Sequence, residues 1–270
     1  MPKSEAPFFL GKLLAIGSVS SLFVYSSVWL LIEHFSVAFK WLYLVSGSIG
    51  LMLVIFMSIV FPRFKTPVEQ TKKLFLRKRY WLYYMLVFLS GARRQIFVVF
   101  AGFLMVEKFG YSAADISLLY LLNHLINLYV APKIGKFISV IGERKALSIE
   151  YIALIFVFSG YALVESADVA AALYIIDHLF FAMAIAIKTY FQKIADPADI
   201  ASTSGVSFTI NHIAAVIIPA SFGIIWLFNP SLVFWIGSLI AIVSLIFSRM
   251  IPELPSQGNE VVKIMKAQKA

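Results

Sequence analysis

Residues 39–61 read FKWLYLVSGSIGLMLVIFMSIVF, an apolar run whose only charged residue is Lys40, near its start. A helix needs about 20 apolar residues to cross the hydrocarbon core of a bilayer. A strand of a membrane barrel needs only about ten residues, and its polar and apolar side chains alternate. The run is too long and too uniformly apolar for such a strand, so it predicts a membrane-spanning helix.

Seven further runs of spanning length occur along the 270-residue chain. Hydrophobic residues make up 61% of the chain and charged residues 14%, against about 45–50% and about 25% in soluble domains. The sequence therefore predicts an all-α, polytopic membrane protein with about eight transmembrane helices, and it argues against a soluble or disordered protein. The predicted spans are residues 8–32, 39–61, 80–106, 113–138, 147–164, 169–190, 205–228 and 232–250.

The positions of the basic residues predict the orientation of the spans. Loops rich in Lys and Arg stay on the cytoplasmic side of a membrane. When successive loops are assigned to alternate sides of the membrane, only Lys40 and Lys108 fall on the outer side. We therefore expect both termini in the cytoplasm and the spans in the inner (plasma) membrane of the cell. This bias accounts for the net charge of +9 without a nucleic acid partner. The linker between the second and third spans carries Arg63, Lys65, Lys72, Lys73, Arg77, Lys78 and Arg79.

The linker divides the chain unequally. We expect a two-span part at residues 1–62, a basic cytoplasmic linker at 63–79, a six-span bundle at 80–252 and a cytoplasmic tail at 253–270. Residues 74–76 of the linker fit either a short interfacial helix on anionic lipid or a solvated connection. No cysteine is present, so disulfides and thiolate metal sites are excluded.

Short polar segments and aromatic clusters predict local features of the spans. Ser112 followed by Asp115 is typical of a capping box at a helix start. Asn229-Pro230 predicts a tight turn between the last two spans. Tyr and Trp residues near span ends are typical of the membrane interface, and this interpretation covers Trp41, Tyr43, Tyr80, Trp81, Tyr83 and Tyr84.

Arg93 and Arg94 lie midway along the third predicted span. An arginine at the centre of a span costs about 2.5–3.5 kcal/mol for membrane insertion. Neighbouring residues differ by about 100° around a helix, so both side chains cannot face one narrow seam. At least one should reach a polar cavity or an acidic partner. A guanidinium grips carboxylate or phosphate, which favours an anion-binding site; the alternative is a structural ion pair with Asp177 or Glu150.

Asp177-His178 lies within the sixth predicted span, where an aspartate is rare and gains from protonation. Asp177 is therefore a candidate for a proton-coupling carboxylate, with a simple charge pair to an arginine as the alternative. His124 and His212 also fall near the middle of spans, each beside an asparagine. The histidines lack metal-ligand spacing on one span, so no metal site is expected. Polar residues expected to line a cavity are Asn123, His124, Asn127, Asn211 and His212.

The loop APKIGKFISVIGERK, residues 131–145, resembles the cytoplasmic-loop signature of the major facilitator superfamily. That signature has a Gly, three residues, an acidic and a basic residue, any residue, a second Gly and two basic residues. Gly135 and Gly142 match its spacing, Arg144 matches its last position and Lys145 extends it. Its other defined positions differ, being Ser139, Val140 and Glu143.

The order of the spans strengthens the resemblance. A long basic loop, six spans and a cytoplasmic tail are similar to the second half of a twelve-span facilitator, and the two preceding spans are similar to its fifth and sixth. Residues 203–225, with Gly205, Asn211, Pro219 and Gly223, resemble the eleventh span. Such transporters bind their substrate between two halves near the midplane. The resemblance implies a truncated or split member that carries one complete half.

The sequence contains no Walker loop, Rossmann fingerprint or GxSxG elbow, so we expect neither an enzyme, nor a cofactor, nor ATP-driven transport. The leading hypothesis is a secondary transporter that moves a small solute across the inner membrane by alternating access, with an anionic solute and proton coupling as its candidate features. Its partners would be the lipid bilayer, the solute and protons. The alternative is a non-transporting scaffold or subunit that partners another membrane polypeptide, which would supply the missing spans.

Overall fold

A computed structural model describes residues 5–62, 68–71, 73–74 and 76–262 of the chain. In this part of the chain, eight helical segments are long and apolar enough to cross a membrane, which confirms the predicted number. Phe75 and Lys72, on which the expected interfacial helix depends, lie outside the described residues. The segments are Ala6–Glu33, Phe39–Val60, Lys78–Phe109, Ala113–Ile141, Glu143–Leu163, Ala167–Ile194, Pro197–Phe228 and Pro230–Arg249.

Five of the spans are single α-helices: α1 (Ala6–Glu33), α2 (Phe39–Val60), α5 (Ala113–Ile141), α6 (Glu143–Leu163) and α10 (Pro230–Arg249). The seventh joins the 3-10 turn η4 (Pro197–Asp199) to α9 (Ile200–Phe228). The third and sixth spans are irregular. The third consists of η1 (Lys78–Tyr80), α3 (Trp81–Gln95), the π-helical η2 (Ile96–Ala101) and α4 (Gly102–Phe109), and the sixth of α7 (Ala167–Phe181), the 3-10 turn η3 (Ala182–Ala184) and α8 (Ile185–Ile194).

The helix starts follow the predicted polar signals. Ser112 Oγ accepts a hydrogen bond from the Asp115 N–H (3.1 Å), and the Asp115 carboxylate accepts one from the Ser112 N–H (2.8 Å), so the capping box is present. At the start of α10, Asn229 Oδ1 accepts from the Leu232 N–H. These side chains satisfy backbone donors that a helix start leaves free.

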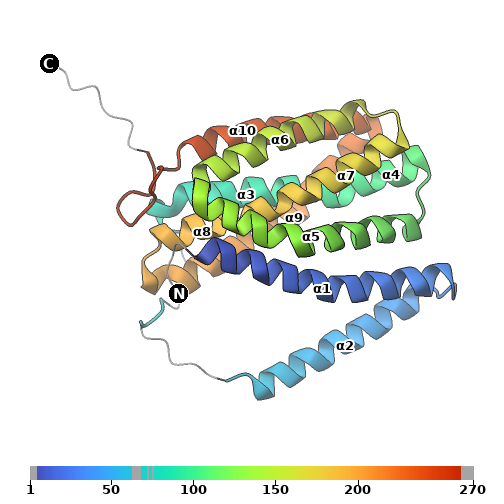
Figure 1. The fold of residues 1–270 in the computed structure, drawn as a ribbon, viewed down its shortest axis with the longest axis horizontal. Helices are drawn as coiled ribbons and strands as arrows, with labels where there is room; N and C mark the ends of the chain where they lie inside the picture. Colours follow the sequence, from blue (N-terminus) through green and yellow to red (C-terminus); the bar gives the residue numbers. More distant parts are fainter. Residues whose placement is uncertain (1–4, 63–67, 72, 75, 263–270) are drawn as a thin grey trace.

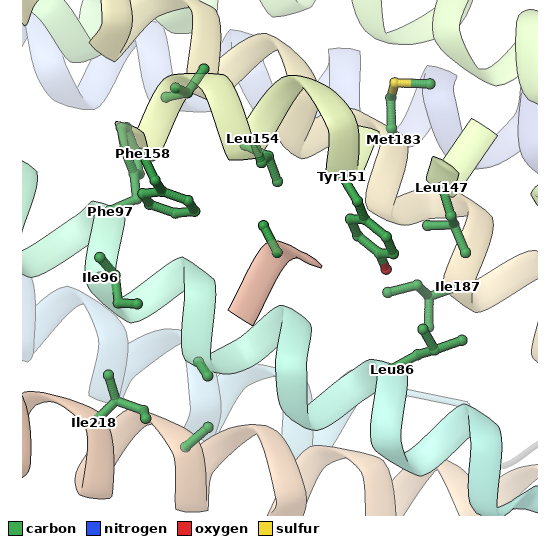
Figure 2. Close-up of a cluster of buried hydrophobic side chains, with 14 of the residues drawn as sticks. Leu86, Ile96, Phe97, Leu147, Tyr151, Leu154, Phe158, Met183, Ile187 and Ile218 are labelled. Atoms are coloured by element: carbon green, nitrogen blue, oxygen red, sulfur yellow. The ribbon is translucent and has the colours of Figure 1, made fainter. Parts of the chain in front are cut away.

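The six spans after the linker form one bundle with an apolar and aromatic core (Figure 1). Figure 2 shows the centre of this core, where side chains of α3, η2, α6, α8 and α9 meet. Leu86, Phe97 and Tyr151 are almost completely buried there. The start of α1 and the ends of α8 and α10 lie at one end of the bundle, beside η1 (Figure 1); we call this the linker end.

The interfacial interpretation is wrong for three of the six aromatic residues. Trp41, Tyr43 and Trp81 are exposed, but Tyr80, Tyr83 and Tyr84 are buried in the bundle. Tyr83, for example, accepts a hydrogen bond from the Ser207 hydroxyl of α9 (2.9 Å). These tyrosines face neighbouring helices, and that orientation depends on the packing of the bundle, which position near a span end does not reveal.

The two spans before the linker differ from the bundle and from each other. Helix α1 packs along α5 (Figure 1), and their backbones touch because both carry glycines. A Cβ atom on Gly11 would lie 2.5 Å from the Ala131 carbonyl oxygen, and one on Gly135 would meet the Pro7 carbonyl oxygen. Helix α2 has no buried residue and lies apart from the bundle in Figure 1.

Candidate functional site

An ion pair lies inside the bundle between α3 and α6. Arg93 NH1 is 3.4 Å from Glu150 Oε1, and the two side chains are only 4% and 3% exposed. The guanidinium carbon of Arg93 lies 4.4 Å from the centre of the Tyr151 ring, which adds a cation–π contact. Glu150 is the acidic partner that the sequence analysis allowed as an alternative for the arginines. Buried charges in a membrane are expected to pair in this way.

Asp177 of α7 completes a buried cluster of charges around the same space. Arg93, Arg94, Glu150 and Asp177 all line a cavity of about 10 Å³, together with Ser90 and apolar side chains. That volume is close to the minimum that holds one water molecule. Asp177 is 1% exposed. Asp177 Oδ2, Glu150 Oε2 and the Nε and NH2 atoms of Arg93 have no hydrogen-bond partner among the described residues. A water in the cavity could serve several of these atoms.

Arg94 differs from its neighbour because the helix turns it away from the core. It is exposed, and its guanidinium carbon lies 5.6 Å from the centre of the Phe181 ring. It therefore sits at the rim of the cavity, whereas Arg93 lies inside. This division agrees with the expectation that two neighbouring residues cannot share one narrow seam.

Two irregular helical segments border the cavity. The π-helical η2 begins directly after Gln95, and η3 begins directly after Phe181 and includes the lining residue Ala184. A π-helical turn contains hydrogen bonds of a longer span than the α-helix and is frequent at functional sites. The charged cluster therefore lies where the third and sixth spans both depart from regular α-helix.

His124 of α5 and His178 of α7 form a second polar group. Their ring centres are 5.6 Å apart with the planes nearly perpendicular, and Tyr25 of α1 stacks on His124 at 5.3 Å. The Nδ1 atoms of both histidines lack a hydrogen-bond partner among the described residues. His178 follows Asp177 in sequence, so the pair lies beside the charged cluster. In the described part of the chain, no group of three or more His, Asp or Glu residues is arranged to hold a metal ion.

None of the other predicted polar residues lines the cavity. Asn123 is buried and Asn127 half-buried on α5, and each has one amide atom without a partner among the described residues. Asn211 of α9 packs against Gly91, where an added Cβ would lie 2.7 Å from its Oδ1 atom. His212 lies on the exposed side of α9, where the centre of its ring is 4.0 Å from that of Phe208.

The expectation that residues 131–145 form a loop is wrong: Gly135 lies within α5, Arg144 and Lys145 lie within α6, and only Gly142 separates the two helices. Gly135 contacts α1, and Gly142 adopts a φ of +83°, a conformation that L-residues rarely adopt. Arg144 is half-buried and Lys145 exposed. Glu143, which replaces a basic residue of the signature, is 1% exposed and pairs with Lys193 of α8 at 2.7 Å. An acidic residue at this position therefore joins the start of α6 to the end of the sixth span.

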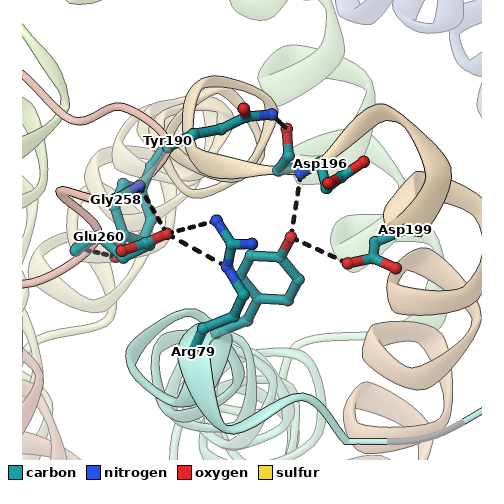
Figure 3. Close-up of polar contacts among 9 residues, drawn as sticks. Arg79, Tyr190, Asp196, Asp199, Gly258 and Glu260 are labelled. Carbon is teal, nitrogen blue, oxygen red and sulfur yellow. Dashed lines mark hydrogen bonds and ion pairs between the residues drawn. The ribbon is translucent and has the colours of Figure 1, made fainter.

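A polar network ties the tail to the linker end of the bundle (Figure 3). Arg79 pairs with Glu260 at 2.6 Å, and the Tyr190 hydroxyl donates to the Glu260 carbonyl oxygen at 2.6 Å. Burial opposes ionisation of the Glu260 carboxyl group, but hydrogen bonds from the Gly258 N–H and Arg79 outweigh it and lower the pKa of Glu260. Nearby, the Tyr80 hydroxyl donates to Asp199 (3.2 Å).

The sequence analysis gave Glu150 only as an alternative partner of the arginines and did not count it among the candidate site residues. The signal that could have placed it is helical spacing. Leu147, Glu150, Leu154 and Phe158 recur at intervals of three and four residues and share one buried face of α6. A glutamate on an otherwise apolar interior face needs a buried partner.

The family model described as Major Facilitator Superfamily matches residues 1–219. No curated protein sequence matches the chain. The family model covers most of the chain, and its members are membrane transporters. With its eight apolar helices, the protein is an integral membrane protein that belongs to the Major Facilitator Superfamily.

Proposed function

We propose that the protein is a secondary transporter that moves a small anionic solute, coupled to protons, across the inner membrane by alternating access, with both termini in the cytoplasm. Membership of a transporter family supports the general activity. The observation that carries the specific proposal is Asp177, a buried carboxyl group that shares a small cavity with the Arg93–Glu150 pair. The steep bias of basic residues toward the linker end supports the orientation.

In this proposal the two arginines have different roles. Arg93 is held by Glu150 and Tyr151 inside the bundle, so it fixes the charge of the cavity. Arg94 is exposed at the rim, so its guanidinium is free to form two parallel hydrogen bonds to a carboxylate or phosphate. Arg94 is therefore the residue that contacts the solute, and Arg93 positions the charges around it.

Proton coupling follows from the charge balance of the cavity. Arg93 and Arg94 oppose Glu150 and Asp177, so the four charges cancel when all are ionised. Protonation of Asp177 leaves one excess positive charge beside Arg94 and favours an anion there. By linkage, a bound anion favours the proton equally. The proton and the anion therefore bind together and are released together, which is symport.

The polar side chains around this cluster complete the proposal. Asn123, His124 and Asn127 of α5, with His178 of α7, would line the route by which protons or solute approach Asp177. His124 and His178 lie in contact between these helices. Asn211 and His212 of α9 do not line the charged cavity, and α9 turns His212 outward. These two residues would therefore contact the solute only outside that cavity. The connection between the fourth and fifth spans would be held at the cytoplasmic surface by Gly135, Gly142, Arg144 and Lys145.

Reconstitution into liposomes tests the proposal. Uptake of radiolabelled phosphate and of small mono- and dicarboxylates would be measured with and without an inward proton gradient. We expect proton-driven accumulation of one of these anions by the wild-type chain. Asp177→Asn should abolish accumulation but retain exchange of solute across the membrane. Arg94→Gln should raise KM about tenfold or more, whereas Arg249→Gln, an exposed arginine at the end of α10, should not.

Two results would overturn the assignments. If Asp177→Asn accumulates solute against a gradient as the wild type does, Asp177 is not the coupling group. If Arg94→Gln and Arg249→Gln behave alike, Arg94 does not contact the solute. Elution of each variant as a single species on size-exclusion chromatography would exclude misfolding as the cause of a loss.

A second candidate function is a membrane subunit that assembles with other membrane helices. The observation that favours it is α2, which has no buried residue although it is the length of a span. This candidate predicts that the chain co-purifies with another integral membrane protein and that it moves no solute when reconstituted alone. Proton-driven uptake by the isolated chain would exclude it.

A further inference from the structure

An apolar groove runs along the outside of the bundle between α5, α6 and the junction of α7 with η3. Its volume is about 310 Å³, within the range of known ligand pockets. Six apolar side chains and a single charged one line it. The apolar ones are Ile134, Phe137, Ile149, Leu179, Phe180 and Met183, and the charged one is Lys133.

The depth of the groove places it in one half of the bilayer. Lys133 precedes Ile141, the end of α5, by eight residues, or roughly 12 Å along the helix. Ile149 follows Glu143, the start of α6, by six residues, or roughly 9 Å. A lysine at this depth extends its amine toward the headgroup region while its stem stays among apolar atoms. The groove thus joins the hydrocarbon core to the interface at the linker end.

The positive charge at the groove is not paired with an acidic side chain in the described part of the chain. Lys133 is exposed, and no carboxylate lies within 4 Å of its amine among the described residues. Lys136, one helical turn further along α5, is also exposed and similarly lacks an ion pair in that part of the chain. No acidic side chain lines the groove. A ligand that complements this surface carries a negative charge at one end and an apolar chain at the other.

We propose that this groove binds one anionic phospholipid, with an acyl chain along Phe137, Ile149 and Met183 and the phosphate at Lys133. A soluble anion would leave the apolar lining uncovered, and a neutral glyceride would leave the lysine unpaired. Basic sites between membrane helices on the cytoplasmic side suit acidic headgroups. The lipid is recognised by both parts of its structure, because the cation and the apolar wall are adjacent.

The bound lipid also contacts the segment that borders the charged cavity. Phe180 and Met183 line the groove, whereas Phe181 and Ala184, their neighbours in sequence, line the cavity that holds Arg93 and Asp177. The two sites thus lie on different faces of the same stretch of α7 and η3. An acyl chain in the groove therefore packs against the lipid-facing side of the 3-10 turn η3, at Met183.

Lipid titration of the full-length chain tests the site. The protein, purified in detergent and depleted of lipid, would be titrated with phosphatidylglycerol or phosphatidylcholine, and bound lipid counted by native mass spectrometry. We expect at least a fivefold preference of the wild type for phosphatidylglycerol at its first site. Lys133→Gln should remove that preference, whereas Lys145→Gln, an exposed lysine at the start of α6, should keep it.

A second pair of variants tests the apolar wall. Ile149→Trp fills the groove and should weaken the first binding event for both lipids, while Ile152→Trp should not. The two isoleucines lie on the same helix with similar exposure, 42% and 46%, but only Ile149 lines the groove. The proposal is overturned if Lys133→Gln retains the preference for phosphatidylglycerol, or if Ile149→Trp and Ile152→Trp bind lipid equally.

A label inside the groove keeps the test independent of folding losses. The chain has no cysteine, so a single Phe137→Cys variant can carry a fluorophore at the groove wall. Phosphatidylglycerol with brominated acyl chains should quench this fluorophore more strongly than brominated phosphatidylcholine at the same mole fraction. Equal quenching by the two lipids would contradict a site selective for the anionic headgroup.

Discussion

The two spans before the linker and the six after it have similar hydropathy but differ in how much of each span is buried. The most apolar 18 residues of α2 have a mean hydropathy of 2.2, and those of the sixth span 2.0. None of this stretch of α2 is buried, whereas 44% of that of the sixth span is. The bundle buries tyrosines and charged side chains, whereas α1 is attached to α5 through glycine contacts. Hydropathy therefore marks a span, while polar and small residues mark where one helix meets another.

The largest expected effect breaks the charged interior of the bundle. Glu150→Gln leaves Arg93 buried and without its ionised partner, which typically costs about 3–5 kcal/mol. We expect a large fall in the thermal unfolding temperature of the detergent-solubilised protein, measured by intrinsic fluorescence. The double variant Arg93→Met with Glu150→Met removes both charges and should lose less than Glu150→Gln alone.

A surface pair serves as the control for this prediction. Glu165 pairs with Lys108 at 2.9 Å, but its side chain is 84% exposed. Exposed pairs contribute about 1 kcal/mol or less, so Glu165→Gln should change the unfolding temperature little. Equal effects of Glu150→Gln and Glu165→Gln would show that the buried pair has no special role in the bundle.

The second prediction concerns the attachment of α1. Gly135→Val places a side chain against the Pro7 carbonyl oxygen and the Phe8 Cα atom, so α1 must move away from α5. Overpacking of this kind typically costs about 1–3 kcal/mol. With cysteines introduced at the exposed positions Val19 and Leu125, spin-label distances between α1 and α5 should lengthen and broaden.

A second glycine of α1 is the matched control. A Cβ on Gly17 meets no atom within 4 Å, so Gly17→Val should leave the distances between the labels unchanged. If Gly135→Val also leaves them unchanged, the glycine contact does not determine how α1 sits on α5. Unfolding of the six-span bundle should respond less to either variant than to Glu150→Gln.

The contrast between the two regions also explains how much could be predicted from the sequence. The number of spans and the helix starts at Ser112 and Pro230 were predicted correctly because hydropathy and capping are local properties. The burial of Tyr80 was not, because the same aromatic residue suits a membrane interface or a bundle interior. The partner of Glu150 depends on which face of α6 meets α3, and that is a property of the packed bundle.

The charged site illustrates the same limit. The sequence identified Arg93, Arg94 and Asp177 because charges are rare in spans, and rarity can be seen in one chain. It left open which arginine is buried, since a step of about 100° separates the two but does not say which faces the core. It also gave no indication that His212 faces outward, because α9 buries other polar residues, such as Thr203 and Ser207, while His212 is exposed.

The smallest expected effect concerns the linker end, where Glu260 of the tail contacts Arg79 and Tyr190 of the bundle. The folded structure lowers the pKa of Glu260, so its ionised form stabilises the folded state above the usual glutamate pKa of about 4.3. That stabilisation is lost as the pH falls through the folded pKa. We expect the unfolding temperature of the wild type to fall in acid more steeply than that of Glu260→Gln. Because Arg79 is 39% exposed, the difference should correspond to about 1 kcal/mol or less.

Glu253→Gln, in the same tail, is the control and should keep the wild-type dependence of unfolding temperature on pH. If wild type and Glu260→Gln show the same dependence, the tail is held by the hydrogen bond from Tyr190 to the Glu260 backbone instead.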